Sequence, residues 1–422
     1  MPLNSSSSSE NCIADAINKT VTPQDVALVA QRFTEDPLVQ VLKYDLGNYS
    51  SHKLGFLGSH RQLTVEIKRK DESDVETLKF FVKSVPYDCE KQAEFISDLA
   101  VFDEEYNFFN AIAPVLLKNY VGEKFAPICY LPKPDSLIME DLRCRNYQLR
   151  ESFFDCYQEV KSALSTLARF HASCIIAEAE LTQSYKKPTT LKDYCPNHLT
   201  EKVFKKDIRS YIWVKHGTEI VCAVAERIGR DPEKLRRGLD RLYEVVKPSK
   251  VHRNVIAHSD LWTNNVMFDD TKPTPKSVLV DFQVLRYGPQ VLDVLKLLHL
   301  HTSRDFRKTH EKELVQIYQS VVEETVKMSK MSGIAKVSSL QETVAAMDDL
   351  RIFGPGMASL YFPMVLMDPE ILKEKTKDSE GFNNFLFGDR IEITLEYMEK
   401  SELYNNRIVG AVSDLANICD TL

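Results

Sequence analysis

Apolar and polar residues alternate along much of the first third of the chain, which is the spacing of a half-buried β-strand. The clearest run has Leu63, Val65 and Ile67 separated by polar residues. This pattern predicts strands over residues 54–58, 63–67, 78–83, 127–131 and 136–139. Helical spacing is limited in this part to residues 92–111 and to a shorter helix that begins at Thr22-Pro23. A small antiparallel sheet with one long helix is therefore expected.

Beyond residue 141 the apolar residues recur at helical spacing. Helices are predicted over residues 152–181, 200–228, 232–247, 289–301, 308–330, 338–350 and 389–416. Short apolar segments predict strands at 255–257, 266–268 and 278–280. The expected fold class is α+β in two lobes. We predict a disordered, serine-rich tail at 1–12, an N-lobe with the sheet at 13–141, and a mostly helical C-lobe at 142–422.

Composition and charge exclude several classes of function. The net charge is −7, whereas proteins that bind nucleic acid or anionic membranes usually carry a basic excess. No window of the sequence approaches the roughly 20 apolar residues of a membrane span. The nine cysteines include no C-x-x-C pair, which favours reduced thiols and a cytoplasmic location. We therefore expect neither a nucleic-acid nor a membrane partner, and no pattern indicates an obligate protein partner.

The strongest chemical signal is a short polar segment in the predicted C-lobe. His258 and Asp260 are followed, five residues after the acid, by Asn265. A second acid, Asp281, ends the apolar run 278–280, 21 residues after Asp260. Phosphoryl transfer from ATP needs one carboxylate to orient the acceptor hydroxyl and accept its proton, and an amide and a second carboxylate to hold Mg²⁺. The order H-x-D-x-x-x-x-N and then D-F-x matches the catalytic and metal-binding loops of kinases, so ATP and Mg²⁺ are the expected cofactors.

Other interpretations of these residues stay open. Asn264 competes with Asn265 for the metal, although the spacing favours Asn265. Asp281 can be a helix cap instead of a metal ligand, and His258 is better interpreted as a residue that braces the loop than as a chemical group. Asp293, 12 residues after Asp281, is expected to bond to the catalytic loop from below.

The N-lobe is expected to supply a lysine that contacts the phosphates and a carboxylate that holds it. Lys83 ends the strand of residues 78–83, and Glu105 follows 22 residues later in the predicted helix. Glu104 is the rival for this role, but the neighbouring phenylalanines place Glu105 along the buried face and Glu104 further out. An exposed strand end is the other interpretation of Lys83.

Two backbone elements complete the predicted nucleotide site. Gly55, Gly58 and Ser59 lie between two strands, where backbone amides can approach phosphates, although a plain hairpin turn fits as well. Glu140 and Leu142 lie where the lobes join, so their backbone groups are candidates to read the adenine edge. A linker without ligand contact is the alternative there.

Two segments, HSDLWTNNVMF at 258–268 and LVDFQVLRYGPQVLDVLKLL at 279–298, resemble the ecdysteroid kinase-like family of insects, which is similar to choline kinases and aminoglycoside phosphotransferases. The agreement extends to FFVKSVP, FDEEYNFF, LIMEDL and LARFHAS, so it covers most of residues 50–300. The resemblance implies a two-lobed protein-kinase-like fold. It also implies ATP-dependent phosphorylation of a hydroxyl on an ecdysteroid or similar apolar alcohol, for hormone inactivation or detoxification.

Matching the family's motif positions implies a role for each candidate residue. Asp260 is the implied catalytic base, and Asn265 and Asp281 are the implied Mg²⁺ ligands. Lys83, held by Glu105, is the implied phosphate-binding residue.

The chain departs from the family at Ser259, where H-G-D usually has glycine, and its phosphate loop is loosely formed. We expect Ser259 to restrict the loop backbone. A protein kinase is excluded, because only 12 residues separate Asp281 from Asp293 and no A-P-E motif follows. Two other hypotheses stay open: a non-catalytic member that binds nucleotide or steroid, and a choline- or aminoglycoside-type kinase.

Two further segments are ambiguous in the sequence. Residues 353–364 combine glycines, aromatic residues and methionines, which suits either an apolar acceptor pocket or simple packing of the core. His299 and His301 have no third ligand in sight, so we expect them to face solvent and not to hold zinc.

Overall fold

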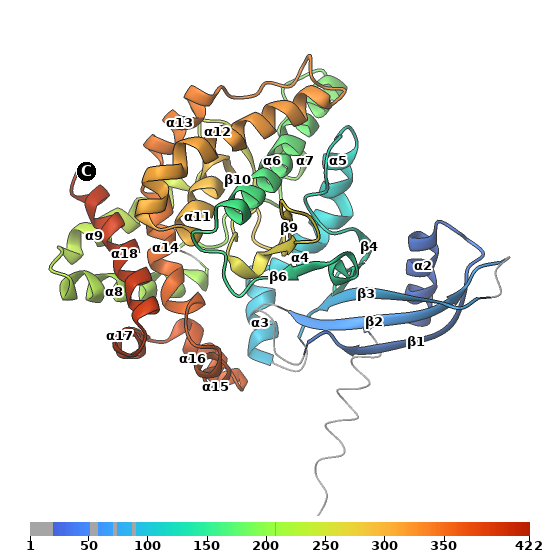
Figure 1. Ribbon diagram of the computed structural model, residues 1–422, viewed down its shortest axis with the longest axis horizontal. Coiled ribbons are helices and arrows are strands. Elements are labelled where there is room, and N and C mark those ends of the chain that lie inside the picture. Colours follow the sequence, from blue (N-terminus) through green and yellow to red (C-terminus); the bar gives the residue numbers. More distant parts are fainter. Residues whose placement is uncertain (1–19, 51–57, 71–73, 87–89, 207) are drawn as a thin grey trace, which may run out of the picture.

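Five antiparallel strands form the N-terminal sheet of the computed structural model, which describes residues 20–50, 58–70, 74–86, 90–206 and 208–422 (Figure 1). In spatial order the strands are β1 (Gln40–Asn48), β2 (Ser59–Lys68), β3 (Glu76–Ser84), β5 (Ser136–Glu140) and β4 (Cys129–Pro132). Strand β3 pairs Lys83 with His60 of β2 on one side and with Leu137 of β5 on the other. The predicted tail at 1–12 and most of the predicted strand at 54–58 lie outside the described residues.

The sequence pattern does not predict β1, which is an edge strand of this sheet. Along its nine residues the side chains are exposed or only partly buried. An edge strand that buries so little surface has no need of the apolar alternation by which strands are recognised.

Helix α2 (Pro23–Thr34) packs against the sheet and begins where the sequence predicts. Thr22 and Asp25 form a reciprocal capping box: Asp25 N donates to Thr22 Oγ1 at 3.2 Å, and Thr22 N donates to Asp25 Oδ2 at 2.9 Å. Val26, Val29 and Ala30 of the helix pack against the apolar face of β2 and β3. The sheet and α2 therefore share a hydrophobic core separate from that of the C-terminal region.

The single helix predicted over 92–111 is wrong, because the chain forms a series of shorter helices there. They are α3 (Glu90–Leu99), α4 (Val101–Asn107), the π-helical turn η1 (Phe108–Ile112) and α5 (Ala113–Leu117). Ala100 has the left-handed backbone conformation (φ +49°), which a continuous helix does not allow.

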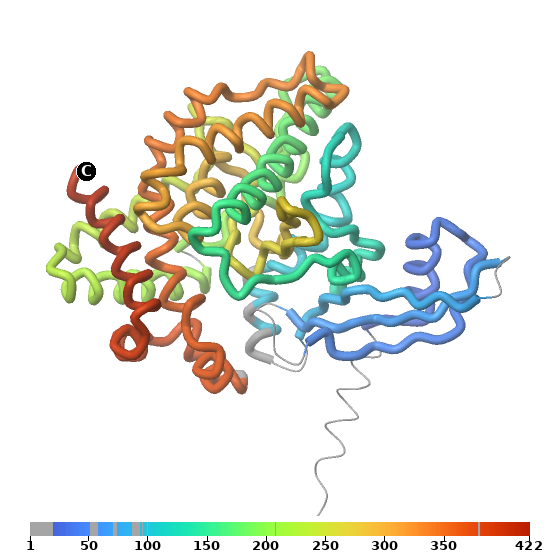
Figure 2. Tube along the Cα trace, in the orientation of Figure 1, coloured from blue at the N-terminus to red at the C-terminus, as the bar shows by residue number. Residues whose placement is uncertain are grey.

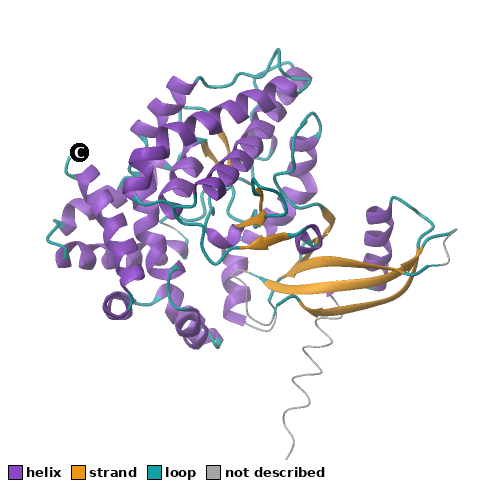
Figure 3. Cartoon of the chain, viewed as in Figure 1, coloured by secondary structure: helices purple, strands orange, loops and turns teal. Residues whose placement is uncertain are grey.

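The C-terminal region is mostly helical, as Figure 3 shows. Its α-helices are α6 (Tyr157–Tyr185), α7 (Leu191–Tyr194), α8 (Ser210–Arg227), α9 (Pro232–Asp240), α10 (Leu242–Val245), α11 (Val291–His301), α12 (Arg304–Met328), α13 (Leu340–Asp349), α14 (Phe353–Val365), α15 (Pro369–Lys375), α16 (Ser379–Phe387), α17 (Ile391–Lys400) and α18 (Glu402–Cys419). Helix α6 packs against α11, α12 and the strand β9 (Lys276–Leu279). Helix α18 ends the chain yet lies beside α8 and α9 (Figure 2).

Short strands position the loops of the C-terminal region. Strand β7 (Asn254–Ala257) pairs with β10 (Arg286–Pro289), and β8 (Val266–Asp269) lies between β6 (Tyr147–Leu149) and β9. The turn η2 (Leu142–Arg145) follows β5. The turn η3 (Thr263–Asn265) leads directly into β8. An antiparallel sheet followed by a mostly helical region is the predicted protein-kinase-like fold, and this prediction is confirmed.

Helix α14 is absent from the sequence prediction. Helix α14 contains Pro355, Pro363 and two glycines, which disfavour helices, and nearly all of its side chains are buried. A helix that is apolar on every side has no hydrophobic period to detect. Tertiary packing therefore determines this helix.

His299 and His301 are buried on α11, so the prediction that they face solvent is wrong. His301 stacks on Phe153 with ring centres 3.8 Å apart, and its Nε2 lies 3.2 Å from the Leu261 carbonyl oxygen. His299 packs against Gly354 of α14 so closely that a Cβ there would lie 2.2 Å from the imidazole. Helix α11 is buried along its whole length, which removes any solvent-facing side.

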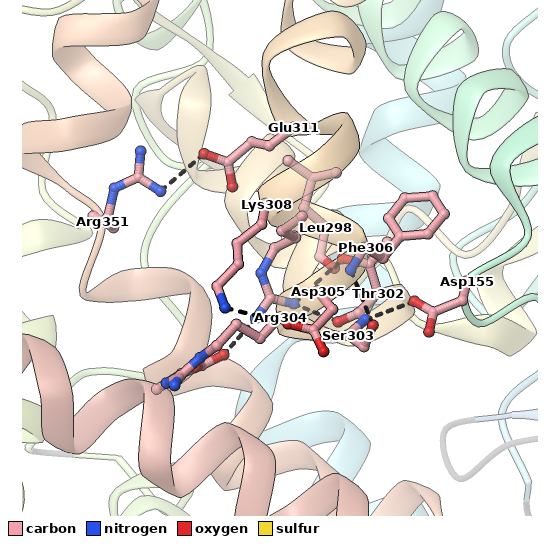
Figure 4. Close-up of polar contacts among 12 residues, drawn as sticks. Asp155, Leu298, Thr302, Ser303, Arg304, Asp305, Phe306, Lys308, Glu311 and Arg351 are labelled. Atoms are coloured by element: carbon pink, nitrogen blue, oxygen red, sulfur yellow. Dashed lines mark hydrogen bonds and ion pairs between the residues drawn. The ribbon is translucent and has the colours of Figure 1, made fainter.

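The junction of α11 and α12 is fixed by polar contacts (Figure 4). Ser303 caps α12, since its Oγ accepts from Phe306 N at 3.2 Å. Its own N donates to Asp155 Oδ1 at 2.7 Å, and Thr302 Oγ1 donates to the Leu298 carbonyl at 2.5 Å. These bonds tie the end of α11 to the segment before α6.

None of the described helices is both long enough and apolar enough to cross a membrane.

Candidate active site

A pocket lies between the five-stranded sheet and the helical C-terminal region. The sheet contributes Phe81, Lys83 and Met139 to its lining. The loops after β7 and β9, together with α14, line the other side. Glu140 and Leu142, the candidates for reading the adenine edge, also line it where β5 leaves the sheet. The structure therefore brings the candidate nucleotide and catalytic residues to one cavity.

Lys83 lies near the end of β3 with its side chain buried, so its interpretation as an exposed strand end is wrong. Its Nζ donates to Glu105 Oε2 at 2.6 Å and to Asp281 Oδ1 at 2.6 Å. Gln283 Oε1 accepts from the same nitrogen at 3.4 Å. Gly58 packs against the lysine stem, because a Cβ at this position would lie only 3.1 Å from Lys83 Cε.

Glu105 lies on α4 and connects Lys83 to the loop after β9. Its Oε1 accepts from the backbone N of Phe282 at 3.1 Å. Glu104 is as buried as Glu105, so the prediction that it points further out is wrong. Glu104 Oε1 instead accepts from Leu199 N at 2.9 Å, which ties α4 to the loop before α8.

The carboxylates of Glu105 and Asp281 both accept from the Lys83 ammonium and influence its pKa. Burial alone would lower the pKa of Lys83, but Asp281 and Glu105 raise it above its usual range. Burial, together with the Glu105 carboxylate, raises the pKa of Asp281 to about 7, and Lys83 offsets this rise only in part. An ionised Asp281 therefore needs a cation beside it, and Lys83 is that cation here.

Asp260 lies in the loop between β7 and β8, and each of its carboxylate oxygens has a donor. Oδ2 accepts from Asn265 Nδ2 at 2.9 Å. Oδ1 accepts from the Tyr361 hydroxyl at 3.0 Å and lies 3.6 Å from Lys296 Nζ. Asn265 is buried and also donates to the Asp260 carbonyl at 2.8 Å, and both Asn265 and its rival Asn264 line the pocket.

Asp293 supports this loop from below, as the sequence predicts. Its Oδ2 accepts from His258 N at 2.6 Å, and its Oδ1 accepts from Ser259 N at 2.9 Å. His171 Nε2 lies 3.2 Å from the same carboxylate, while His171 Nδ1 lies 2.7 Å from the Tyr318 hydroxyl. Burial would raise the pKa of Asp293, but His171, His258 and the Ser259 amide lower it. The carboxylate is therefore held in its charged form.

Asp293→Ala is expected to lower the free energy of unfolding by about 3 kcal/mol, because two buried amides and a histidine lose a charged partner. Urea denaturation measures the change. Asp240→Ala, at an exposed carboxylate on α9, is the matched control and should leave stability within about 0.5 kcal/mol. An unfolding midpoint of Asp293→Ala equal to that of the control would contradict the supporting role.

One residue in each of the two candidate loops, the catalytic and the metal-binding loop, adopts the left-handed backbone conformation. Ser259 has φ +68° and Asp281 has φ +72°. Glycine adopts this conformation freely, so Ser259 carries strain of about 1 kcal/mol that a glycine at this position would avoid. Such strain collects at functional sites when the surroundings hold it in place.

The predicted phosphate loop is described only in part. Gly55 lies outside the described residues, whereas Gly58 is buried and Ser59 begins β2, opposite Ser84 of β3. Contact of their backbone amides with phosphates stays a prediction.

The sequence matches the model of one protein family over most of its length. The model of the ecdysteroid kinase-like family matches residues 55–331, more than half of the chain. The chain belongs to the ecdysteroid kinase-like family. This family is one of small-molecule kinases, and the candidate site residues lie within the matched span. Among curated proteins, none matches the sequence.

Solved structures of small-molecule kinases align with this family member at low similarity. They include Plasmodium vivax ethanolamine kinase, with 11% identity and a TM-score of 0.36 over 96% of this chain and 99% of the other. An aminoglycoside phosphotransferase solved with streptomycin and ATP has 13% identity and a TM-score of 0.38 over 90% and 99%. A microcompartment-associated aminopropanol kinase has 10% identity and a TM-score of 0.32 over 89% and 98%. Similarity this low carries no argument about the acceptor.

The oxygen donors of the two loops fit Mg²⁺. The Asn265 amide and the Asp281 carboxylate lie on adjacent loops, joined by a bond of 3.0 Å from Val280 N to the Asn265 carbonyl. Mg²⁺ prefers oxygen ligands and usually takes only one or two carboxylates from a protein, with phosphates and water completing its shell. In the part of the chain that the structure describes, no three His, Cys, Asp or Glu side chains gather to hold a metal by themselves. Asn265 and Asp281 therefore suit a magnesium ion that arrives with a nucleotide.

Sequence reasoning missed two side chains of the site, Gln283 and Lys296, and it missed the contact of Tyr361 with Asp260. Gln283 Nε2 donates to Asp281 Oδ2 at 3.0 Å, and Tyr361 and Lys296 lie at Asp260 Oδ1. The spacing of Lys296, three residues after Asp293 on one helix, could have indicated that both face the catalytic loop. No local pattern connects Tyr361 to Asp260, which lies 101 residues earlier.

Proposed function

We propose that this protein is an ATP- and Mg²⁺-dependent kinase that phosphorylates a hydroxyl of an ecdysteroid or a similar apolar alcohol. One observation carries the proposal: the group of Lys83, Glu105 and Asp281 and the pair of Asp260 and Asn265 line one pocket. These residue types in this arrangement serve phosphoryl transfer.

Each residue has a distinct role in the proposed reaction. Bound Mg²⁺–ATP supplies the phosphoryl group, with its charge neutralised by the metal. Asn265 and Asp281 would hold the metal, and Lys83, oriented by Glu105, would contact the α- and β-phosphates. Asp260 would orient the acceptor hydroxyl and accept its proton as the acceptor oxygen bonds to the γ-phosphorus, while the bond from that phosphorus to the β–γ bridging oxygen breaks and ADP leaves.

The acceptor side of the pocket supports an apolar substrate. It is lined by Val203, Trp213, Trp262, Tyr361, Met364 and Phe387. Apolar and aromatic walls with few polar groups are typical of sites for drug-sized ligands. The carboxylates among the described lining residues are Glu105, Glu140, Asp260 and Asp281, all in or near the nucleotide and catalytic positions. A polycationic aminoglycoside would need additional acidic residues on the acceptor side.

The aromatic side chains also disfavour a quaternary amine such as choline. Lys296 Nζ lies 3.9 Å from the centre of the Tyr361 ring, and the Arg209 guanidinium lies 4.6 Å from the centre of the Phe387 ring. Cation-binding cages use such ring faces. A cationic acceptor would approach rings that already interact with the protein's own cations, so a neutral alcohol suits the pocket better.

Incubation with ATP, Mg²⁺ and a panel of acceptors tests the proposal. The panel contains ecdysteroids, plant-derived alcohols, choline and an aminoglycoside, and mass spectrometry detects the added phosphate. Phosphorylation of an apolar alcohol is expected. Phosphorylation of choline or the aminoglycoside alone would overturn the acceptor assignment, and nucleotide binding without turnover of any acceptor or of ATP would favour a non-catalytic member.

Met364→Ala is expected to raise the KM for the apolar alcohol about 10-fold and to leave the KM for ATP unchanged, because the lost apolar contact is made in both the ground and transition states. Steady-state kinetics with each substrate varied in turn measure both constants. Tyr361→Ala should also raise the acceptor KM, but its hydroxyl contacts Asp260, so Met364 is the cleaner test.

Met267→Ala is the matched control for this experiment. Met267 lines the same pocket but packs with Leu142 and Val278, on the side expected to hold the nucleotide. It should change the KM for ATP and spare that for the alcohol. If Met364→Ala raised the KM for ATP instead, the division of the pocket into nucleotide and acceptor sides would be wrong.

A further inference from the structure

Lys296 is completely buried inside the C-terminal region, beside the loop that carries Asp260. Lysine is almost never fully buried without a partner, because an ammonium loses its hydration there. It lies on α11 and is not among the residues that line the pocket. The residues around Lys296 must therefore compensate for its ammonium charge, because the side chain does not reach into the pocket.

All the contacts of Lys296 described here concern the catalytic loop or the side chain that bonds to it. Its Nζ donates to the Ser259 carbonyl at 2.5 Å and lies 3.6 Å from Asp260 Oδ1. The same nitrogen lies over the ring of Tyr361, whose hydroxyl donates to Asp260 Oδ1 at 3.0 Å. Lys296 and Tyr361 thus approach the same carboxylate oxygen, Lys296 from the buried interior and Tyr361 from the wall of the pocket.

Two side chains on one face of α11 bond to the backbone of Ser259, the residue before Asp260. Asp293 accepts from Ser259 N, and Lys296, one helical turn later, donates to the Ser259 carbonyl. Ser259 has the strained left-handed conformation, so these two bonds help to hold it there. The direction in which the chain enters Asp260 is therefore determined by α11.

Burial lowers the pKa of Lys296 to about 8, an effect that Asp260 and Asp293 oppose and that Arg286 reinforces. The side chain therefore remains mostly protonated at neutral pH. As an ammonium, it attracts Asp260 Oδ1 from a fully buried position, where electrostatic interactions are stronger than in water.

We propose that Lys296 is a positioning residue which, together with Tyr361, holds Asp260 Oδ1 and so directs the carboxylate toward the acceptor hydroxyl. The inference rests on the proposed kinase activity with Asp260 as its base. Oδ1 interacts with both Tyr361 and Lys296, whereas Oδ2 has Asn265 as its partner. Oδ2 is therefore the atom that accepts the proton of the acceptor.

Lys296→Met tests this role, because methionine keeps the volume of the side chain and removes only its charge and donors. We expect kcat to fall about 10–100-fold, as a slight misplacement of a catalytic group produces, with the KM for ATP within about twofold of wild type. The melting temperature should fall, because the variant leaves the buried Ser259 carbonyl without its donor and Asp260 without its cation, so rates are compared at a temperature at which both proteins are folded. Leu297→Met, at the next buried residue of α11, is the packing control and should keep wild-type kcat.

A double-mutant cycle separates positioning from a general structural effect. In an Asp260→Asn background, Lys296→Met and Tyr361→Phe should each lower the remaining rate by less than about twofold, because their target is already lost. An equal loss of rate in both backgrounds, or wild-type kcat for Lys296→Met alone, would overturn the inference.

A crystal structure of Lys296→Met provides a test that needs no turnover. The Asp260 carboxylate should leave its position against the Tyr361 hydroxyl. An unmoved carboxylate would overturn the positioning role even if the kinase activity is established. Absence of activity in the wild-type protein, with Asp260 displaced in the variant, would instead count against the proposed function.

Discussion

Asp260→Asn is expected to lower turnover by about 10²–10⁴-fold and to leave nucleotide affinity nearly unchanged. Asparagine has the shape of aspartate but cannot accept the proton of the acceptor hydroxyl. The carboxylate is also the common partner of Tyr361 and Asn265, and an amide has only one oxygen to offer these two donors. The loss therefore concerns the transition state, since the contacts of Lys83 with Glu105 and Asp281 remain intact.

Two measurements test this prediction. Single-turnover kinetics with saturating acceptor report the chemical step, and titration calorimetry reports nucleotide affinity. Asp240→Asn, on the exposed end of α9, is the control and should behave as wild type. Near-normal turnover in Asp260→Asn would remove this residue from the proposed mechanism.

Asp281→Ala is expected to abolish productive binding of Mg²⁺–ATP and to lower kcat/KM by about 10³-fold, because several kcal/mol of charge stabilisation depend on a correctly held metal. Asn265→Ala should have a weaker effect in the same direction, since an amide oxygen carries no net charge. In the present structure both oxygens of Asp281 are engaged, one by Lys83 and one by Gln283. Lys83 thus neutralises a carboxylate that we expect Mg²⁺ to neutralise in the complex.

Thermal unfolding with ATP, in the presence and absence of Mg²⁺, tests this expectation directly. A ligand that binds only the folded state raises the melting temperature. For the wild type, Mg²⁺ should increase the stabilisation by ATP, and for Asp281→Ala it should not. The variant in Mg²⁺ should then resemble the wild type in a chelator. If Asp281→Ala bound and hydrolysed Mg²⁺–ATP as well as the wild-type protein does, the site would not be kinase-like.

Local sequence was sufficient for features that depend on neighbouring residues. Alternating apolar residues predicted β2 and β3, and the capping residues Thr22 and Asp25 predicted the start of α2. The spacing of Asp260 and Asn265 predicted one loop, and Asp281 after an apolar strand predicted a second. Both predictions were possible because each loop is only a few residues long. The family resemblance, carried by the same segments, was confirmed by the match over residues 55–331.

Other features depend on contacts between distant segments. Ala100 divides a helix that its apolar spacing would continue, and α14 forms although it contains prolines and lacks a polar face. His299 was expected in solvent because its neighbours in sequence do not show that the surrounding segments cover every side of α11. Burial is decided by the whole fold, whereas periodicity records only one element at a time.

The sequence by itself determined the two-lobed protein-kinase-like architecture, the family and the order of the candidate catalytic residues. Only the tertiary structure decided which side chains surround Asp260. Tyr361 lies 101 residues after it and Lys296 lies 36 residues after it, yet both reach the same oxygen. Neither contact leaves a local pattern, because a side chain is brought to a carboxylate by the packing of α11 and α14 and not by spacing along the chain.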